Sequence, residues 1–181
     1  ITSITDTVGA ETLVISSGSG TVSSANAATY ASADINEGTL TLGNGTNGGL
    51  ASNYTLTGHA ASSFQVAQRV LSSSGSRIYD GSTTASSSDL TLSNLVGSET
   101  LTLSGNGILA NANVGTNKSV TLNTLSIANG TNGGLAANYI LTGGTHQLTV
   151  TQRVVHATGT RLYDATSNAH FSDLSLGNLV G

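Results

Sequence analysis

The sequence carries one charged and aromatic motif twice, Arg-x-Tyr-Asp at 77–80 ("RIYD") and again at 161–164 ("RLYD"). A guanidinium, a phenol and a carboxylate this close together could bind a ligand or cation, or could form a structural ion pair. Arg and Asp stand three residues apart, at the predicted end of a strand, so the carboxylate can pair with the guanidinium and also cap amides of the turn. We predict a structural motif, with a metal or ligand site as the alternative. Its residues are Arg77, Tyr79, Asp80, Arg161, Tyr163 and Asp164.

The charge pattern supports the structural interpretation. The chain has five basic and nine acidic residues, and ten of these 14 charges recur in a second copy of the surrounding sequence. In a chain this poor in charge, we expect recurring charges to have fixed partners. The recurring pairs are Arg69 with Arg153, Arg77 with Arg161, Asp80 with Asp164, Asp89 with Asp173, and Glu11 with Glu99.

No other pattern predicts a catalytic, cofactor or metal site, and we predict that the chain is not an enzyme. There is no G-x-S-x-G, and no Ser, His and Asp are singled out by spacing. The four histidines do not recur, which predicts surface or loop positions for His59, His146, His156 and His170. The absence of cysteine excludes disulfides, thiol catalysis and cysteine metal sites.

Neither a repeated calcium site nor covalent cross-links are expected. Asp34, Asn36 and Glu37 stand together in "SADINEG", but the matching "NANVG" has neither acid, so a repeated calcium site is not expected. Lys118 is the only lysine and has no counterpart in the other copy, which argues against isopeptide cross-links.

Composition limits the partners. Of the 181 residues 23 are Gly, none is Pro, Cys, Met or Trp, and 8% are charged, against about 25% in ordinary globular domains. A net charge of −4 with one Lys and four Arg argues against nucleic-acid binding. No stretch approaches the roughly 18 apolar residues of a membrane span, so no membrane insertion is expected. The opening "ITSITDTVGA" lacks the layout of a signal peptide, so either a signal was removed or this is a section of a longer chain.

Internal repetition is the strongest signal. Residues 68–97 match 152–181 with an offset of 84, and 44–58 match 129–143 with an offset of 85. A third pair, starting at Val8 and Val96, is offset by 88.

These offsets predict three segments. Residues 67–151 form one complete unit, 1–66 a unit that lacks its first strands, and 152–181 the first third of a further unit. The chain is therefore either a section of a longer array, or 152–181 of one molecule completes 1–66 of a neighbouring subunit by strand complementation.

The elements that position the motif are predicted to be β-strands. Apolar residues alternate in "SFQVAQRV", "DLTLSNLV" and "ETLTLSG", and Asn-Gly pairs at 44–45, 106–107 and 129–130 predict turns with positive φ. Helical periodicity is absent, apart from one possible short turn in "GGLASNY". We predict an all-β fold of tandem β-sandwich-like (Ig-like) domains strung as beads, because an 84-residue period is long for the alternative, a β-solenoid.

The chain resembles the YDG-type repeats of large bacterial surface proteins, such as haemagglutinin-like adhesins. The resemblance rests on "RIYDGSTT…SDLTLSNLVG" and "NVGTNKSVTL…ANYILTG", and Ala165 and the missing Pro-containing linkers depart from it. It implies a secreted or cell-surface stalk or adhesin segment without enzymatic activity. The matching residues are Tyr79, Asp80, Gly81, Asn113, Val114, Gly115, Asn138, Tyr139 and Leu141.

Two functions remain open at this point. The first is a structural module of an extracellular bacterial surface protein, with the chain itself as partner through head-to-tail neighbours or adjacent repeats. The alternative is an adhesion module that binds host or matrix glycans, or ice, through its Thr-x-Thr strands ("TLTL", "LTLS"). Such threonines are also ordinary on solvent-facing strands. Neither function requires a cofactor.

Overall fold

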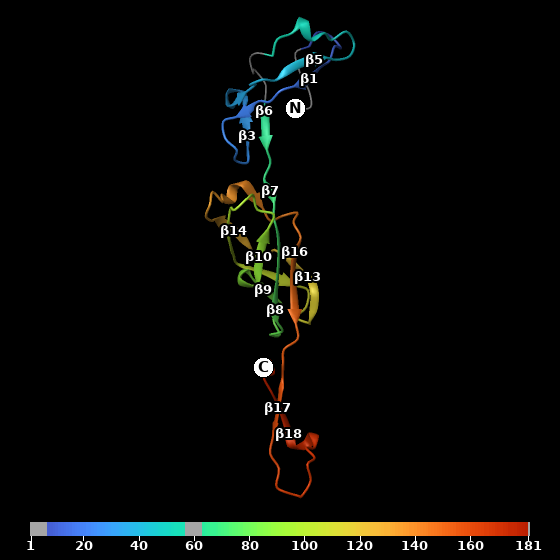
Figure 1. Cartoon of the computed structure of the whole chain (residues 1–181), viewed down its shortest axis with the longest axis vertical. Helices are drawn as coiled ribbons and strands as arrows, with labels where there is room; N and C mark the ends of the chain where they lie inside the picture. The colour runs from blue at the N-terminus through green and yellow to red at the C-terminus, as the bar shows by residue number, and fades with distance from the viewer. Residues whose placement is uncertain (1–6, 57–62, 181) are drawn as a thin grey trace. The chain divides into compact units, whose positions relative to one another are not determined.

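The computed structural model describes residues 7–56 and 63–180 (Figure 1). The chain divides into two compact units, residues 1–68 and 69–181. The described part of both is built from β-strands, and its only helices are 3₁₀ turns of three residues. The predicted all-β class is therefore confirmed. No helix of the described part is long and apolar enough to cross a membrane.

The second unit contains a six-stranded sheet that curls into a half-barrel (Figure 1). The strand order is β10-β8-β16-β13-β12-β9, so strands from both ends of residues 69–151 meet in the middle of the sheet. Smaller two-stranded sheets flank it. The six strands are β8 (Ser72–Ile78), β9 (Thr84–Ser86), β10 (Leu90–Ser93), β12 (Asn106–Leu109), β13 (Gly115–Thr121) and β16 (His146–Thr151).

The remaining strands of this unit form pairs. Short β7 (Arg69–Val70) pairs in parallel with β15 (Tyr139–Ile140), and β11 (Leu101–Ser104) pairs antiparallel with β14 (Ser126–Asn129). Past residue 151, β17 (His156–Gly159) and β18 (Leu174–Gly177) form a hairpin. The 3₁₀ turns are η3 (Ser87–Asp89), η4 (Ala136–Asn138) and η5 (Phe171–Asp173).

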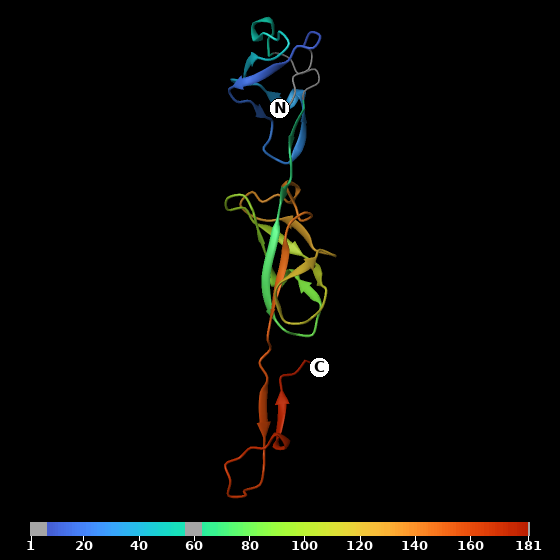
Figure 2. The ribbon, with the colours of Figure 1, turned by 90° about the vertical axis from the view of Figure 1, so that its right-hand side faces the viewer.

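One parallel pairing closes the unit by joining the two parts of the sheet. Strand β8 pairs antiparallel with β10 on one side and parallel with β16 on the other, from His146↔Ser73 to Thr151↔Ile78. Figure 2 shows these two strands side by side. Because 73 residues separate the paired positions His146 and Ser73, this pairing joins the beginning of the unit to its end.

The core lies where the sheet curls around β8 and β16. Leu71, Leu109, Leu148 and Val150 are almost fully buried, and Ala85 is completely buried. Alternation along β16 places Leu148 and Val150 on the core face, as expected for a strand with one buried face. Tyr79, Leu92 and Leu95 pack against this core from its margin.

The first unit repeats the later strands of the second. Strand β1 (Leu13–Ser17) pairs with β5 (Thr41–Asn44) as β11 pairs with β14. The pair β2 (Thr21–Val22) and β4 (Ile35–Asn36) corresponds to β12 and β13, and β3 (Ala28–Ala31) pairs with β6 (Ser63–Val66) as β13 pairs with β16. Two 3₁₀ turns, η1 (Ser32–Asp34) and η2 (Ala51–Asn53), complete the described elements.

The turn predictions were partly wrong. The Asn-Gly pairs at 44–45, 106–107 and 129–130 lie in strands or at their ends, and positive φ falls three residues later, at Asn47-Gly48 and Asn132-Gly133. Asn44 and Asn129 instead use their side-chain oxygens to accept the amides of Ala51 and Ala136, each at 2.8 Å. The short helical turn expected in "GGLASNY" is confirmed as η2.

We predict that Leu148→Ala destabilises the second unit by about 2–5 kcal/mol, because it empties a fully buried position. Urea denaturation followed by far-UV circular dichroism measures the loss. Leu162→Ala is the matched control, since Leu162 is 91% exposed and its truncation should change stability by no more than about 0.5 kcal/mol. Equal effects of the two substitutions would contradict this assignment of the core.

Candidate functional site

The first Arg-x-Tyr-Asp motif lies where β8 ends and the chain turns into β9. The Arg77 side chain is 10% exposed, and its Nη1 lies 3.1 Å from Asp80 Oδ2. The same Nη1 donates to the Thr84 carbonyl at 2.6 Å, and Nη2 donates to the Ser82 carbonyl. Asp80 Oδ1 accepts the Ser82 amide at 2.9 Å, so the carboxylate caps the turn as well as pairing with the guanidinium. Arg77 Nε is buried without a hydrogen-bond partner among the described residues.

The second copy builds the same local arrangement. Arg161 Nη1 donates to Asp164 Oδ1, Nη2 donates to the Thr166 carbonyl at 2.5 Å, and the Thr166 amide donates to Asp164 at 3.0 Å. The Thr166 amide, the Arg161 guanidinium and the Thr166 hydroxyl together hold the pKa of Asp164 below its usual value. The motif therefore forms its turn from local contacts in both copies.

The residue after the aspartate has positive φ in both copies. Gly81 has φ +77° and Ala165 has φ +60°. Glycine adopts this conformation freely, whereas alanine is strained there. The hydrogen bonds of the Arg-Asp turn are thus sufficient to hold an alanine in a left-handed conformation.

The tyrosines of the two motifs differ in environment. Tyr79 packs against the core, and its amide donates to the Thr151 carbonyl at 2.8 Å, which extends the pairing of β8 with β16. Tyr163 is 93% exposed. The structure therefore brings Arg77, Tyr79 and Asp80 together at the end of a strand inside the six-stranded sheet, and Arg161, Tyr163 and Asp164 at a separate two-stranded hairpin.

The Arg-Asp turn is one repeated joint, by which we mean a side-chain contact that holds a turn or strand end in both copies. A second such joint was only partly visible in the sequence. Tyr139 is buried; its hydroxyl donates to Glu99 Oε2 at 2.5 Å and accepts the Val96 amide at 3.1 Å. Tyr54 makes the same contacts with Glu11 and Val8, at 2.5 and 3.1 Å. The recurrence of Glu11 and Glu99 predicted fixed partners, but nothing in the sequence identified tyrosines about 40 residues away as those partners.

Burial and the hydrogen bond to Glu99 raise the pKa of Tyr139. The hydrogen bond to Glu11 comes first among the causes that raise the pKa of Tyr54. In both joints, the phenol is held in its protonated form because the protonated hydroxyl donates to a carboxylate.

A third joint uses arginine and asparagine. Arg69 donates from Nε and Nη2 to the main-chain and side-chain oxygens of Asn94, both at 2.7 Å. Asn94 has φ +71° and donates to the Val70 carbonyl. Arg153 and Asn178 repeat this arrangement, with distances of 2.7 and 2.6 Å.

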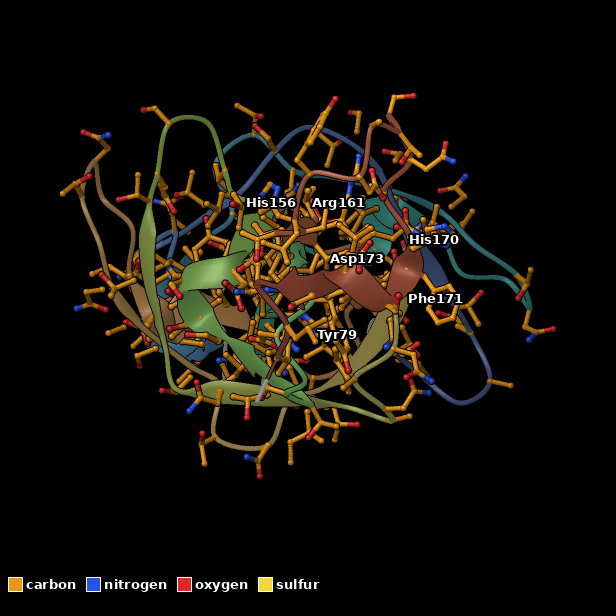
Figure 3. The ribbon with its side chains drawn as sticks, turned by 90° about the horizontal axis from the view of Figure 1, so that it is seen from below. Tyr79, His156, Arg161, His170, Phe171 and Asp173 are labelled. Atoms are coloured by element: carbon orange, nitrogen blue, oxygen red, sulfur yellow. The ribbon has the colours of Figure 1, made fainter. Side chains whose placement is uncertain are left out.

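One histidine prediction was wrong. His146 lies in β16, is 7% exposed, and bridges Ser73 Oγ and the Leu141 carbonyl, each at 2.9 Å. Its ring therefore links the beginning and the end of the unit inside the core. His156 and His170 are exposed in residues 152–181, which we call the tail. Figure 3 shows His170, Phe171 and Asp173 gathered around η5. His59 lies outside the described residues.

The acidic segment 34–37 and Lys118 each have local contacts. Asp34 accepts the Ser23 hydroxyl at 3.1 Å, and Asn36 accepts the Gly38 amide at 2.8 Å. Lys118 Nζ donates to the carbonyls of Asn111 and Asn113 at 2.7 and 2.5 Å. Within residues 7–56 and 63–180, no group of three or more His, Cys, Asp or Glu could hold a metal ion.

The fold and its joints define an all-β chain in which one structural unit recurs, with the same charged residues at the same turns. Residues 66–147 match the family model of the YDG domain, and these residues include the parallel closure and the first Arg-x-Tyr-Asp motif. This part of the chain is a YDG domain. No curated protein and no solved structure matches the chain.

We predict that Arg77→Ala lowers the stability of the second unit by about 2 kcal/mol, because three hydrogen bonds of a largely buried guanidinium are lost. Arg161→Ala is the matched control, since the same motif lies outside the six-stranded sheet there, and a change within about 0.5 kcal/mol is expected. Urea midpoints measured by circular dichroism compare the two. A larger loss for Arg161→Ala would refute the structural role of the first motif.

A second prediction concerns alkaline pH. Because the pKa of Tyr139 is raised on folding, the unfolded chain loses this proton first as pH rises above about 10. The stabilisation is thus complete below that pH and declines as pH rises toward the folded-state pKa. Tyr139→Phe should lower stability at neutral pH and reduce the alkaline loss, measured as urea midpoints against pH. Tyr163→Phe should leave the alkaline loss in place; an unchanged profile in Tyr139→Phe would contradict the assignment.

Proposed function

We propose that the chain is a non-enzymatic structural repeat module of an extracellular bacterial surface protein, acting as a stalk, an adhesin segment or a filament. In this proposal, β-sandwich-like units are strung in tandem. The observation that carries it is the closure of the YDG domain, in which a strand from the first third of the unit pairs with the last strand. Each unit therefore needs both of its ends, and the chain contains two further partial copies of the same unit.

The use of the recurring charges supports a structural role. Arg69, Arg77, Asp80 and Glu99 all have partners that hold loops or strand ends. Their counterparts in the other copy repeat the bonds to asparagine, between arginine and aspartate, to the turn carbonyl and amide, and from tyrosine to glutamate. The same contacts are expected to recur in successive copies when each copy is a structural repeat of one scaffold.

The tail carries an apolar surface that the complete unit buries. Leu174 is 42% exposed where its counterpart Leu90 is 7% exposed, and Val155 is 44% exposed where Leu71 is fully buried. In the described residues β17 pairs with β18 alone, whereas its counterpart β8 pairs with both β10 and β16. The tail thus offers a strand edge together with apolar side chains.

The first unit offers the complementary edge. In the described residues its β6 pairs with β3 alone, whereas the counterpart β16 pairs on both sides. Phe64 is 41% exposed where its counterpart Leu148 is fully buried. The covered apolar area would favour association, at about 1.5–3 kcal/mol for each large side chain that becomes fully buried.

The complete unit specifies the register of such a joint. Leu148 pairs with Gly75 and Thr149 with Ser76. Applying the 84-residue offset, Phe64 of one copy would pair with Gly159 of the next, and Gln65 with Thr160. We therefore propose head-to-tail strand complementation, in which 152–181 of one molecule adds in parallel to 63–66 of its neighbour.

Cysteine pairs test this register, since the natural chain has no cysteine. Gln65→Cys with Thr160→Cys should form a ladder of disulfide-linked oligomers on mild oxidation, because paired positions of neighbouring strands lie about 5 Å apart. Gln65→Cys with Thr158→Cys is the control: its cysteines lie two residues out of register, about 8 Å apart, which exceeds the reach of a disulfide. Equal ladders from both pairs, or none from the first, would refute the register.

Deletion of 152–181 gives a separate test of assembly. The shortened chain should remain monomeric in sedimentation experiments, while the full chain forms elongated polymers visible by electron microscopy. Circular dichroism should show that the 67–151 unit still folds after the deletion. Polymers that persist without 152–181 would rule out complementation by the tail, whereas compact monomers of the full chain at every concentration would rule out the filament form.

A further inference from the structure

The two ends of the YDG domain lie at opposite ends of one parallel strand pair. The chain enters at β7, runs directly into β8, and leaves through β16 at Thr151. Because β8 and β16 are parallel, the entry point is at the start of one strand and the exit point at the end of its partner. Figures 1 and 2 both show this course, with β7 above the pair and the exit from β16 below it.

The pairing between these segments extends over two strand pairs. Six positions pair from His146↔Ser73 to Thr151↔Ile78, and β7 and β15 add Tyr139↔Arg69 and Ile140↔Val70. Three further backbone hydrogen bonds extend the pairing between β7 and β8 and at both ends of β8. They are the bonds from Leu71 N to Ile140 O (2.8 Å), from Ser73 N to Thr145 O (3.0 Å) and from Tyr79 N to Thr151 O (2.8 Å).

Side chains reinforce the same pairing and exclude water from its middle. The Ser73 hydroxyl bonds His146 at 2.9 Å, Ser72 Oγ accepts the Thr145 amide at 3.1 Å, and the Thr151 hydroxyl donates to the Arg77 carbonyl at 3.2 Å. Leu148 is fully buried and Ser73 is 3% exposed. Water therefore cannot readily replace the central bonds one at a time.

We propose that the parallel β7–β8 and β15–β16 pairing is a mechanical clamp that resists tension applied along the chain. Tension at the two ends of the domain pulls β8 toward its start and β16 toward its end, so the strands are sheared along their length. All the bonds across the pair then carry load together, and they must break nearly at once. A pair pulled from one end would instead open bond by bond.

The clamp is a property of a single complete domain and does not depend on association between copies. It would suit a chain that carries load between two attachment points. Resistance to force is governed by the unfolding rate along the pulling direction, so it is separate from equilibrium stability.

Single-molecule force spectroscopy on the full 181-residue chain tests the clamp, with two engineered cysteines as the attachment points. Gln68→Cys with Gln152→Cys applies force across the domain and loads the pair in shear. Thr83→Cys with Gln152→Cys is the matched control, because both points follow the same end of the pair and force peels it open. Gln68, Thr83 and Gln152 are exposed, so all three substitutions should leave the fold intact.

The expected result is a several-fold higher unfolding force for the 68/152 pair than for the 83/152 pair at the same pulling speed. Urea denaturation and unfolding rates without force should agree between the two proteins, which would show that the difference arises from direction alone. Equal forces in the two geometries, or a higher force for the 83/152 pair, would overturn the proposal. So would a force difference that simply follows a difference in unfolding rate without load.

Discussion

The parallel pairing of β8 with β16 is the interaction on which the rest of the YDG domain depends. It brings Leu71 and Leu148 into one core, although 77 residues separate them in the chain. A contact of this sequence separation requires a large loop to be closed before any energy is gained. His146 lies inside the pairing and bonds both Ser73 and the Leu141 carbonyl, so the burial of a polar ring is compensated by fixed partners. The curl of the sheet and the position of its core both follow from this one closure.

Charged side chains serve as joints around that closure. Each recurring arginine or glutamate links separate segments of the unit: Arg69 bonds the Asn94 turn, Arg77 bonds the 80–84 turn, and Glu99 bonds the Tyr139 hydroxyl of β15. In a chain with 8% charged residues, this use explains why the same charges occur in both copies. The chain segment from Glu11 to Tyr54 is three residues longer than the segment from Glu99 to Tyr139, yet the contact is the same. The contact, rather than the spacing, is therefore what the two copies share.

The sequence predicted the strands well and the hydrogen-bond partners of polar side chains poorly. Alternation in "DLTLSNLV" and its relatives predicted strands, and recurrence predicted that the charges have partners. Alternation in "THQLTVT" places His146 on the same face as Leu148 and Val150, but it could not show that Ser73 and the Leu141 carbonyl bond the ring there and so allow its burial. The sequence also misplaced the Asn-Gly turns, since the asparagine side chains of Asn44 and Asn129 cap the following segment instead. In each case a hydrogen-bond partner of the polar side chain decides its position, and alternation and turn propensity do not identify that partner.

The two copies of residues 68–97 separate local interactions from those that need a complete unit. The tail retains the Arg161–Asp164 pair, the Arg153–Asn178 bonds and the antiparallel hairpin, all of which join residues no more than 25 positions apart. It lacks burial: Tyr163 and Leu174 are exposed where Tyr79 packs against the core and Leu90 is buried. The first third of a unit thus has the information to form its turns and hairpin, while its apolar face requires strands that come later in a unit. In the proposed head-to-tail assembly, the edge of this hairpin would receive the last strand of a neighbouring unit, with the register that the complete unit shows between β8 and β16.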